Sequence, residues 1–262
     1  MPVMPHNPQS RIALLQTALR DADIDAALFN YSRTLLYYCG TTHPAFLMVT
    51  PRDHHLLVLR ALEWVKRETW LRARHLSSAD GHTDVKRMLG SWNVMGGRLG
   101  LELDILPAKV FQKFSRLFPE FDLVDISHIL LEQRKTKDAQ EIQYTREACR
   151  IAHKGHERIM AVLKPGMTEL ELSAEIEDAH RKAGHEGLYF MRQPDFFMGR
   201  GPIASGENLS RIAGKVQSIT GVGLSPSIPL GPSVKQICEG EMIVVDIPTH
   251  CGGYHCDQSR TY

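Results

Sequence analysis

The sequence has no excess of charge of one sign, few cysteines and no long apolar run. Lysine and arginine number 31 against 30 aspartates and glutamates, so nothing favours binding to nucleic acid or an anionic membrane. The five cysteines are odd in number and scattered, which argues against a disulfide framework. No apolar stretch could span a bilayer, and no basic region followed by an apolar run opens the chain. We therefore expect a cytoplasmic protein.

Common catalytic motifs are also missing. The glycines of Gly96-Gly97-Arg98-Leu99-Gly100 precede a strand pattern instead of joining a strand to a helix, so this segment is not a dinucleotide loop. The sequence contains no P-loop and no Gly-x-Ser-x-Gly elbow. Nucleotide binding and serine hydrolysis are therefore not predicted.

The first half of the chain shows alternating helix and strand patterns. Ser10 can cap a helix in which Ile12, Leu15 and Leu19 share one face. The other elements expected here are strands at 23–29, 45–50, 56–60, 98–102 and 121–126, and helices at 61–73, 83–89 and 108–117. These patterns predict one compact α/β domain over residues 1–132.

A charged connector, residues 131–138, precedes a long helix that opens with Asp138 and Glu141 at the spacing of a capping box. A second helix is expected from Thr168, with Glu171 three residues on, to about residue 184. Residues 199–208 and 221–226 are rich in glycine and proline and are predicted as loops. We place the second domain at residues 133–262.

The last stretch holds two carboxylates, Asp246 and Asp257, within a strand pattern. Met242 to Val245 is apolar, and Gly252-Gly253 is typical of a two-residue hairpin loop. In such a hairpin, positions an odd distance apart point to the same face of the sheet, as Asp246 and Asp257 do. A loop at residues 251–252 would place them directly opposite, and one at 252–253 would make them diagonal neighbours.

Two ionised carboxylates about 5 Å apart repel by about 3 kcal/mol at an effective dielectric constant near 20. A divalent cation removes this repulsion, and carboxylates suit manganese, magnesium or zinc, as single ions or as a bridged pair. The alternative is structural: Asp246 ends a strand, and Asp257 lies exposed beside Arg260.

Imidazole and thiolate are zinc ligands, so His250, Cys251, His255 and Cys256 near the aspartates are other candidates, as are two histidines of the long helix. His153 and His156 are three residues apart on the long helix without an acidic partner, so we expect them to face solvent. The hairpin would place His255 on the face of the aspartates, where it could support them without binding metal, and would turn Cys256 away.

The terminal segment resembles the metal-binding motif of the creatinase, prolidase and aminopeptidase P superfamily, family M24, whose catalytic domain has the α+β pita-bread fold. The matching residues are Gly240-Glu241, Val244-Val245-Asp246-Ile247, Gly253-Tyr254, Asp257 and Arg260-Thr261. Other segments similar to family motifs are Tyr37-Tyr38-Cys39-Gly40, Arg98 to Glu102, Arg134 to Ile142 and Lys164 to Glu169. The resemblance implies a creatinase-type N-terminal domain with a ribonuclease H-like mixed sheet, followed by the first half of a pita-bread domain.

The resemblance further implies that Asp246 and Asp257 bind two divalent metal ions, which would be manganese, zinc or cobalt. A metal-activated water would hydrolyse the peptide bond before a proline in a peptide or small amide substrate, and the enzyme would be a homodimer.

Two departures from the family motif lead to alternatives. No histidine lies between His185 and His250, where family peptidases often have one. The family also completes its site with one histidine and two glutamates downstream of the second aspartate, and the sequence stops at Tyr262 before all three. We therefore expect this segment to be inactive by itself. The alternatives are a non-catalytic truncated homologue that acts as a binding or dimerisation module, and a divergent creatinase-like C–N hydrolase or lyase.

Overall fold

The structure is a computed structural model of residues 1–262, and it describes all of them except 1–7, 9, 188–191, 193–200 and 212–218. The chain forms two compact units, Met1–Ala139 and Gln140–Tyr262, which are described separately. The boundary expected at 132/133 falls inside a helix, α6 (Ser127–Lys135).

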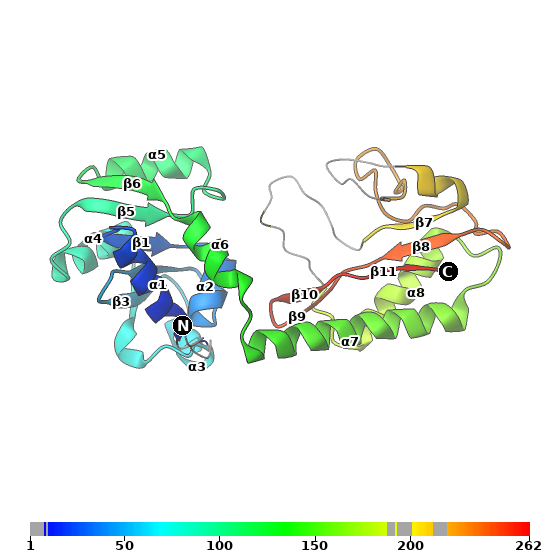
Figure 1. The fold of residues 1–262 in the computed structure, drawn as a ribbon, viewed down its shortest axis with the longest axis horizontal. Coiled ribbons are helices and arrows are strands. Elements are labelled where there is room, and N and C mark those ends of the chain that lie inside the picture. Colours follow the sequence, from blue (N-terminus) through cyan, green and yellow to red (C-terminus); the bar gives the residue numbers. More distant parts are fainter. Residues whose placement is uncertain (1–7, 9, 188–191, 193–200, 212–218) are drawn as a thin grey trace. The chain divides into compact units, whose positions relative to one another are not determined.

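The first unit is built on a six-stranded sheet (Figure 1). Its strands are β1 (Ala26–Phe29), β2 (Ala45–Val49), β3 (His54–Val58), β4 (Leu76–Ser78), β5 (Gly97–Leu101) and β6 (Phe121–Asp125). Its helices are α1 (Ser10–Asp21), α2 (Ser32–Cys39), α3 (Leu62–Glu68), the 3₁₀ turn η1 (Ala73–His75), α4 (His82–Ser91), α5 (Ala108–Leu117) and α6.

The sheet is mixed, as expected. Its order is β4-β3-β2-β1-β5-β6; β2 pairs antiparallel with β1 and β3, and the remaining pairs are parallel. Helices α1, α2 and α6 pack on one face, and α4 and α5 pack on the other. Because both faces are covered, β1 and β2 are buried along their whole length.

Three elements of this unit were missed, namely α2, β4 and α6, and α3 ends earlier than the predicted helix at 61–73. Tertiary contacts decide where α3 ends. The Thr69 hydroxyl donates to the Cys39 carbonyl at 2.5 Å, and the Trp70 indole donates to the Tyr38 carbonyl at 2.9 Å. The charged residues of α6 resembled a connector, but Leu130 is fully buried on the inner side of this helix.

The second unit contains two helices and five strands among the residues that the structure describes. They are α7 (Ala139–Val162), α8 (Glu169–Lys182), β7 (Ile203–Ser205), the 3₁₀ turn η2 (Gly206–Ser210), β8 (Ile243–Asp246), β9 (Thr249–Cys251), β10 (Tyr254–Cys256) and β11 (Ser259–Thr261). The two helices match the prediction, and α8 has the expected capping box between Thr168 and Glu171.

One face of this unit's strands packs on α7 and α8 (Figure 1). The strand order is β11-β8-β7, and β9 and β10 form a separate pair. Residues alternate along β8: Ile243 and Val245 are buried in the core with Ile159 of α7 and Ile176 of α8, while Val244 and Asp246 are half-buried. The core thus fixes which face of β8 carries Asp246.

The loop predicted at residues 199–208 is partly wrong, because β7 lies within it and η2 begins in it. The buried carboxylate of Glu169 on α8 explains the order of this segment. Its Oε1 accepts from the Ser205 backbone N–H at 2.7 Å and from the Asn208 amide at 3.1 Å. Its Oε2 accepts from the Ser233 backbone N–H at 3.0 Å and from the Ser233 hydroxyl at 2.6 Å. These bonds tie β7, η2 and Ser233 to α8 and replace the water that a buried carboxylate loses.

Replacing Glu169 with glutamine should destabilise the protein by about 2–4 kcal/mol. The amide nitrogen would face backbone N–H donors and leave one without an acceptor. Chemical denaturation measures this change. Glu175→Gln on the same helix is the control, because Glu175 forms an exposed ion pair with Arg158, and its loss should cost less than about 1 kcal/mol. Equal effects of the two substitutions would contradict the assigned role of Glu169.

His180 of α8 packs directly on the backbone of α7. Its side chain is 3% exposed, and a Cβ atom added to Gly155 would lie 2.1 Å from the His180 Nε2. Burial lowers the pKa of His180 to about 4, so the ring is neutral near pH 7. Gly155 therefore permits the close approach of α7 and α8 under the sheet.

Gly155→Ala should destabilise the protein by about 1–3 kcal/mol, because the methyl group must displace the buried ring. Gly90→Ala on α4 is the matched control. Nothing lies within 4 Å of a Cβ at Gly90, so alanine there should stabilise by up to about 1 kcal/mol through its helix preference. Melting temperatures of the two variants should move in opposite directions, and a stabilising Gly155→Ala would refute this packing.

Candidate metal centre

A tight turn at Gly252-Gly253 closes the hairpin of β9 and β10. Tyr254 pairs with Cys251, and both glycines have positive φ, 59° and 89°, as a type I′ turn requires. The ring of Tyr254 stacks on Tyr144 of α7 with the centroids 5.7 Å apart. The predicted hairpin is confirmed, and its loop lies at residues 252–253, one of the two positions that the sequence left open.

The same register continues from this hairpin into β8 and β11, where Ser259 pairs with Asp246. Asp257 lies two residues before Ser259, so Asp246 and Asp257 are diagonal neighbours on one face of the strands. This is the second of the two arrangements expected from the sequence. Their role as metal ligands stays a prediction.

The two carboxylates influence each other electrostatically. Loss of surrounding water and, after it, the negative charge of Asp246 raise the pKa of the Asp257 carboxyl. The Ser259 hydroxyl donates to Asp246 Oδ1 at 2.6 Å, and the Asp246 backbone N–H donates to the Pro202 carbonyl at 2.9 Å. Asp246 is thus held in place, while the charge of Asp257 is disfavoured, which suits a pair of carboxylates that receives a cation.

The chemistry of the pair fits a divalent cation, but two carboxylates are a partial ligand set. Among the described residues, no three His, Cys, Asp or Glu side chains converge on one point as metal ligands would. Hydrolytic metal sites use three or more protein ligands. Asp246 and Asp257 could therefore supply part of such a centre.

His250, which the sequence offers as a candidate zinc ligand near the aspartates, is buried. It pairs with His255 across the hairpin, and their ring centroids are 4.8 Å apart. His250 Nδ1 lies 2.6 Å from Glu186 Oε2, and the His250 backbone N–H donates to His185 Nδ1 at 2.9 Å. Alternation places His250 and His255 on the same face as Asp257. The parity argument that placed His255 on this face applies equally to His250, which sequence reasoning named but did not assign to a face.

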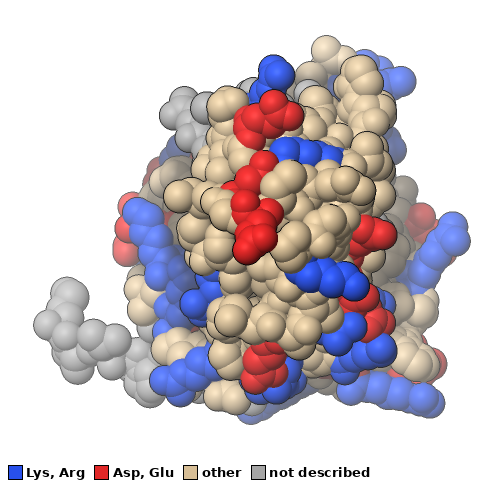
Figure 2. Space-filling view, turned by 90° about the vertical axis from the view of Figure 1, so that its right-hand side faces the viewer, with Lys and Arg blue, Asp and Glu red and all other residues tan. Residues whose placement is uncertain are grey.

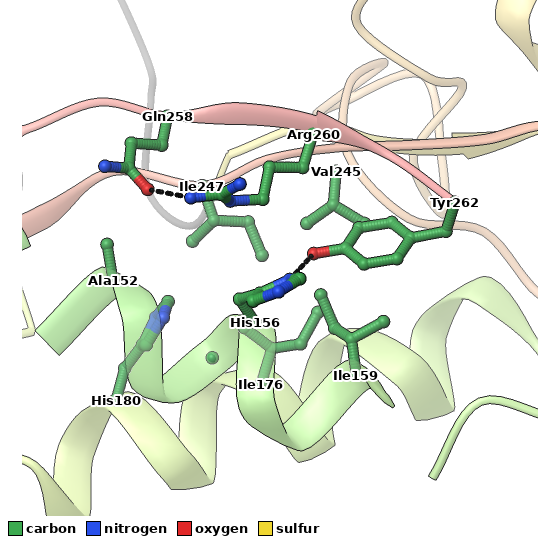
Figure 3. A pocket seen from close by; sticks show the side chains of 11 residues that line it. Ala152, His156, Ile159, Ile176, His180, Val245, Ile247, Gln258, Arg260 and Tyr262 are labelled. Atoms are coloured by element: carbon green, nitrogen blue, oxygen red, sulfur yellow. Dashed lines mark hydrogen bonds between the residues drawn. The ribbon is translucent and has the colours of Figure 1, made fainter. Parts of the chain in front are cut away.

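A small cavity of about 20 Å³ lies on the opposite face of the strands, between β8, β11 and the two helices (Figure 3). Its lining residues are Ala152, Gly155, His156, Ile159, Ile176, His180, Val245, Ile247, Gln258, Arg260 and Tyr262. Its volume suits a single water molecule. The strand residues that line the cavity lie an odd number of positions from the nearer of Asp246 and Asp257 in the sequence, so their side chains point to the opposite face. This cavity is therefore not the candidate metal centre.

The prediction that His153 and His156 both face solvent is half wrong. His153 is exposed and lies 3.5 Å from Glu157, so it also has the acidic neighbour that was not expected. His156 is half-buried, and its Nδ1 forms a 2.8 Å hydrogen bond with the Tyr262 hydroxyl, as Figure 3 shows. The helix turns His156 toward the sheet, because it lies four residues after Ala152 and three before Ile159, which are both buried.

Figure 2 shows acidic and basic side chains interspersed on the face in view, in keeping with the formal net charge of +1. Among the described parts of the chain, no helix is long and apolar enough to cross a membrane.

Comparison with known families accounts for both units. Residues 11–136 match the Creatinase/Prolidase N-terminal domain, and residues 143–262 match Metallopeptidase family M24. The chain therefore belongs to the creatinase/prolidase superfamily of M24 peptidases.

Individual relatives carry several names. Creatinase from Bacillus sp. (strain B-0618) is 25% identical over 170 residues, which are 61% of this chain and 41% of the relative. Probable dipeptidase PepE from Mycobacterium bovis is 30% identical over 135 residues, 51% of this chain and 29% of the relative. The chain thus spans less than half the length of these curated relatives.

Solved structures share the fold. Xaa-Pro dipeptidase from Bacillus anthracis superposes with a TM-score of 0.78 at 20% identity, covering 97% of this chain and 64% of that chain. Prolidase from Pyrococcus furiosus has a TM-score of 0.72 at 20% identity, with coverages of 96% and 70%. The matches confirm the expected fold, a creatinase-type N-terminal domain followed by part of a pita-bread domain.

Asp257→Asn should raise the melting temperature of the metal-free protein at pH 7. A raised pKa means that the folded chain binds the proton more tightly than the unfolded chain, so ionisation of Asp257 lowers stability. The gain should stay below about 1 kcal/mol, because solvent screens this accessible carboxyl. It should vanish as the pH falls to about 4, where the unfolded side chain is also protonated.

Thermal unfolding in a chelator between pH 4 and pH 7 measures this effect. Asp178→Asn is the control in the same unit. It removes an exposed ion pair with Lys182, so it should be neutral or slightly destabilising. A loss of stability in Asp257→Asn at pH 7 would contradict the mutual repulsion of the aspartates.

Proposed function

We propose that this chain supplies two metal ligands, Asp246 and Asp257, of a metal-dependent peptidase that cleaves the peptide bond before proline. The placement of both carboxylates on one face by the Gly252-Gly253 hairpin carries this proposal. The family membership and the names prolidase and Xaa-Pro dipeptidase among the structural relatives support it.

The chemistry assigns separate tasks to the metal and to the chain. Bound divalent ions, which we propose to be manganese, zinc or cobalt, supply Lewis-acid activation of water and of the scissile carbonyl. The hydrogen bond from the Ser259 hydroxyl and the pairing of β8 with β11 fix the direction of the Asp246 carboxylate. Asp257, whose pKa is raised in the absence of a cation, gains a partner for its charge.

Residues 1–262 offer two such carboxylates, so we propose that they bind metal weakly and do not turn over substrate alone. Fewer than three protein ligands fix neither the position nor the number of the ions. The intact mass of the native protein from its source, with the DNA after codon 262, tests how far the ligand set extends. We also propose a cytoplasmic homodimer, which light scattering of the native protein tests.

A C–N hydrolase acting on small amides is the second candidate. Relatives named Creatinase and Ectoine hydrolase support it; the latter is from Halomonas elongata and is 34% identical over 82 residues, 30% of this chain and 21% of the relative. A panel of Xaa-Pro dipeptides and small non-peptide amides, offered to the native protein with manganese, distinguishes the two candidates.

Asp246→Asn and Asp257→Asn should each weaken manganese binding by about 10-fold or more in calorimetric titration. In the native protein each should lower the rate of dipeptide hydrolysis by about 100-fold or more, since each removes a ligand that positions the Lewis acid. Asp178→Asn should leave both quantities unchanged. The proposal fails if both variants bind manganese like the wild type, or if the native protein with manganese cleaves neither class of substrate.

A further inference from the structure

Three cysteines gather where the β9–β10 hairpin packs on α7. Cys256 is 6% exposed and packs with Ala148 and Ala152 of α7, and the half-buried Cys149 and Cys251 border this cluster. Cys149 belongs to α7 and Cys256 to β10, so 106 intervening residues separate two neighbouring thiols. The metal proposal uses none of these thiols.

Cys149 and Cys256 come from elements far apart in the sequence and lie in one cluster where α7 meets the hairpin. Cys256 pairs with Thr249 across the hairpin. The surrounding contacts fix the hairpin in this position, since the Thr249 hydroxyl donates to the Ala148 carbonyl at 2.7 Å and Tyr254 stacks on Tyr144. Helix and hairpin thus hold Cys149 and Cys256 within one packed cluster, and a disulfide requires two neighbouring thiols.

We propose that Cys149 and Cys256 are a redox-sensitive thiol pair whose disulfide clamps the β9–β10 hairpin onto α7. The more accessible thiol is Cys149, because it is half-buried whereas Cys256 is buried. The oxidant is a small disulfide such as oxidised glutathione.

The reaction is a double thiol–disulfide exchange. The Cys149 sulfur attacks the small disulfide, forms a mixed disulfide and releases one small thiol. The Cys256 sulfur then attacks the Cys149 sulfur and releases the second small thiol. Two protein thiols lose their hydrogens and form one S–S bond, while the small disulfide is reduced to two thiols.

This clamp acts next to a candidate metal ligand. Asp257 follows Cys256, and alternation turns its side chain to the opposite face of the strand. A disulfide holds its sulfur atoms about 2 Å apart, closer than thiols in contact, so its formation draws β10 toward α7 and moves Asp257 relative to Asp246. This consequence rests on the proposed function, whereas the disulfide itself does not.

Peptide mapping of the intact protein tests the pair. The protein is freed of reductant, treated with oxidised glutathione, alkylated and digested without reduction. We expect the Cys149 and Cys256 peptides to be linked, and dithiothreitol to separate them. Cys149→Ser should abolish the link, whereas Cys251→Ser and Cys238→Ser should retain it; Cys238 is exposed and serves as the matched control. Two alkylated thiols at residues 149 and 256, or a bridge through Cys251, would overturn the proposal.

Hydrogen exchange tests the clamp without reference to metal. Amides of the β9–β10 hairpin should exchange more slowly after oxidation in the wild type and be unchanged in Cys149→Ser. Equal exchange in oxidised and reduced wild type would overturn the clamp.

Manganese titration tests the link to Asp257. Affinity should fall about 10-fold on oxidation of the wild type and not change in Cys149→Ser. If the reduced protein binds no manganese, the proposed function fails, and the peptide map and exchange data still decide the thiol pair. If the reduced protein binds manganese and oxidation leaves the affinity unchanged, the coupling to Asp257 is wrong.

Discussion

The candidate centre depends on one continuous antiparallel register. It begins at the Gly252-Gly253 turn and ends at the pairing of Ser259 with Asp246. A shift by one residue would move Asp257 to the helix-facing side and Cys256 to the face of Asp246. The turn resists such a shift, because both glycines have positive φ and a Cβ at Gly252 would lie 2.4 Å from the Tyr144 ring.

Two buried polar side chains of α8 position the segments that pack around these terminal strands. Glu169 is fully buried and organises residues 205–208 and 233 through hydrogen bonds to N–H and O–H groups. His180 packs on α7 at Gly155, so the helix pair presents a defined surface to the strands. A buried carboxylate without hydrogen-bond donors is costly, so the hydrogen bonds of Glu169 specify one arrangement more sharply than apolar packing does.

The sequence predicts the elements whose signal is local. Periodicity predicts α1, α5 and the alternating α/β pattern, and the parity of a two-residue hairpin predicts that Asp246 and Asp257 share one face. What it missed depends on distant contacts: β7 is ordered by Glu169, 36 residues away along the chain from Ser205, and α3 ends where Thr69 and Trp70 bind the end of α2. His156 was misplaced because the orientation of α7 beneath the sheet is not encoded in the spacing of its histidines.

Alternation gives the terminal strands two chemically different faces. One carries the aspartates with His250 and His255, and the other carries aliphatic side chains, the small cavity and the cysteine cluster. The faces share one backbone, so any force that moves β10 on the helix side also moves Asp257 on the other. The affinity of two carboxylates for a metal ion changes with such displacements, because it depends on the direction of the ligand atoms as well as on their charge. The link between the two faces therefore follows from strand geometry and needs no separate pathway of communication.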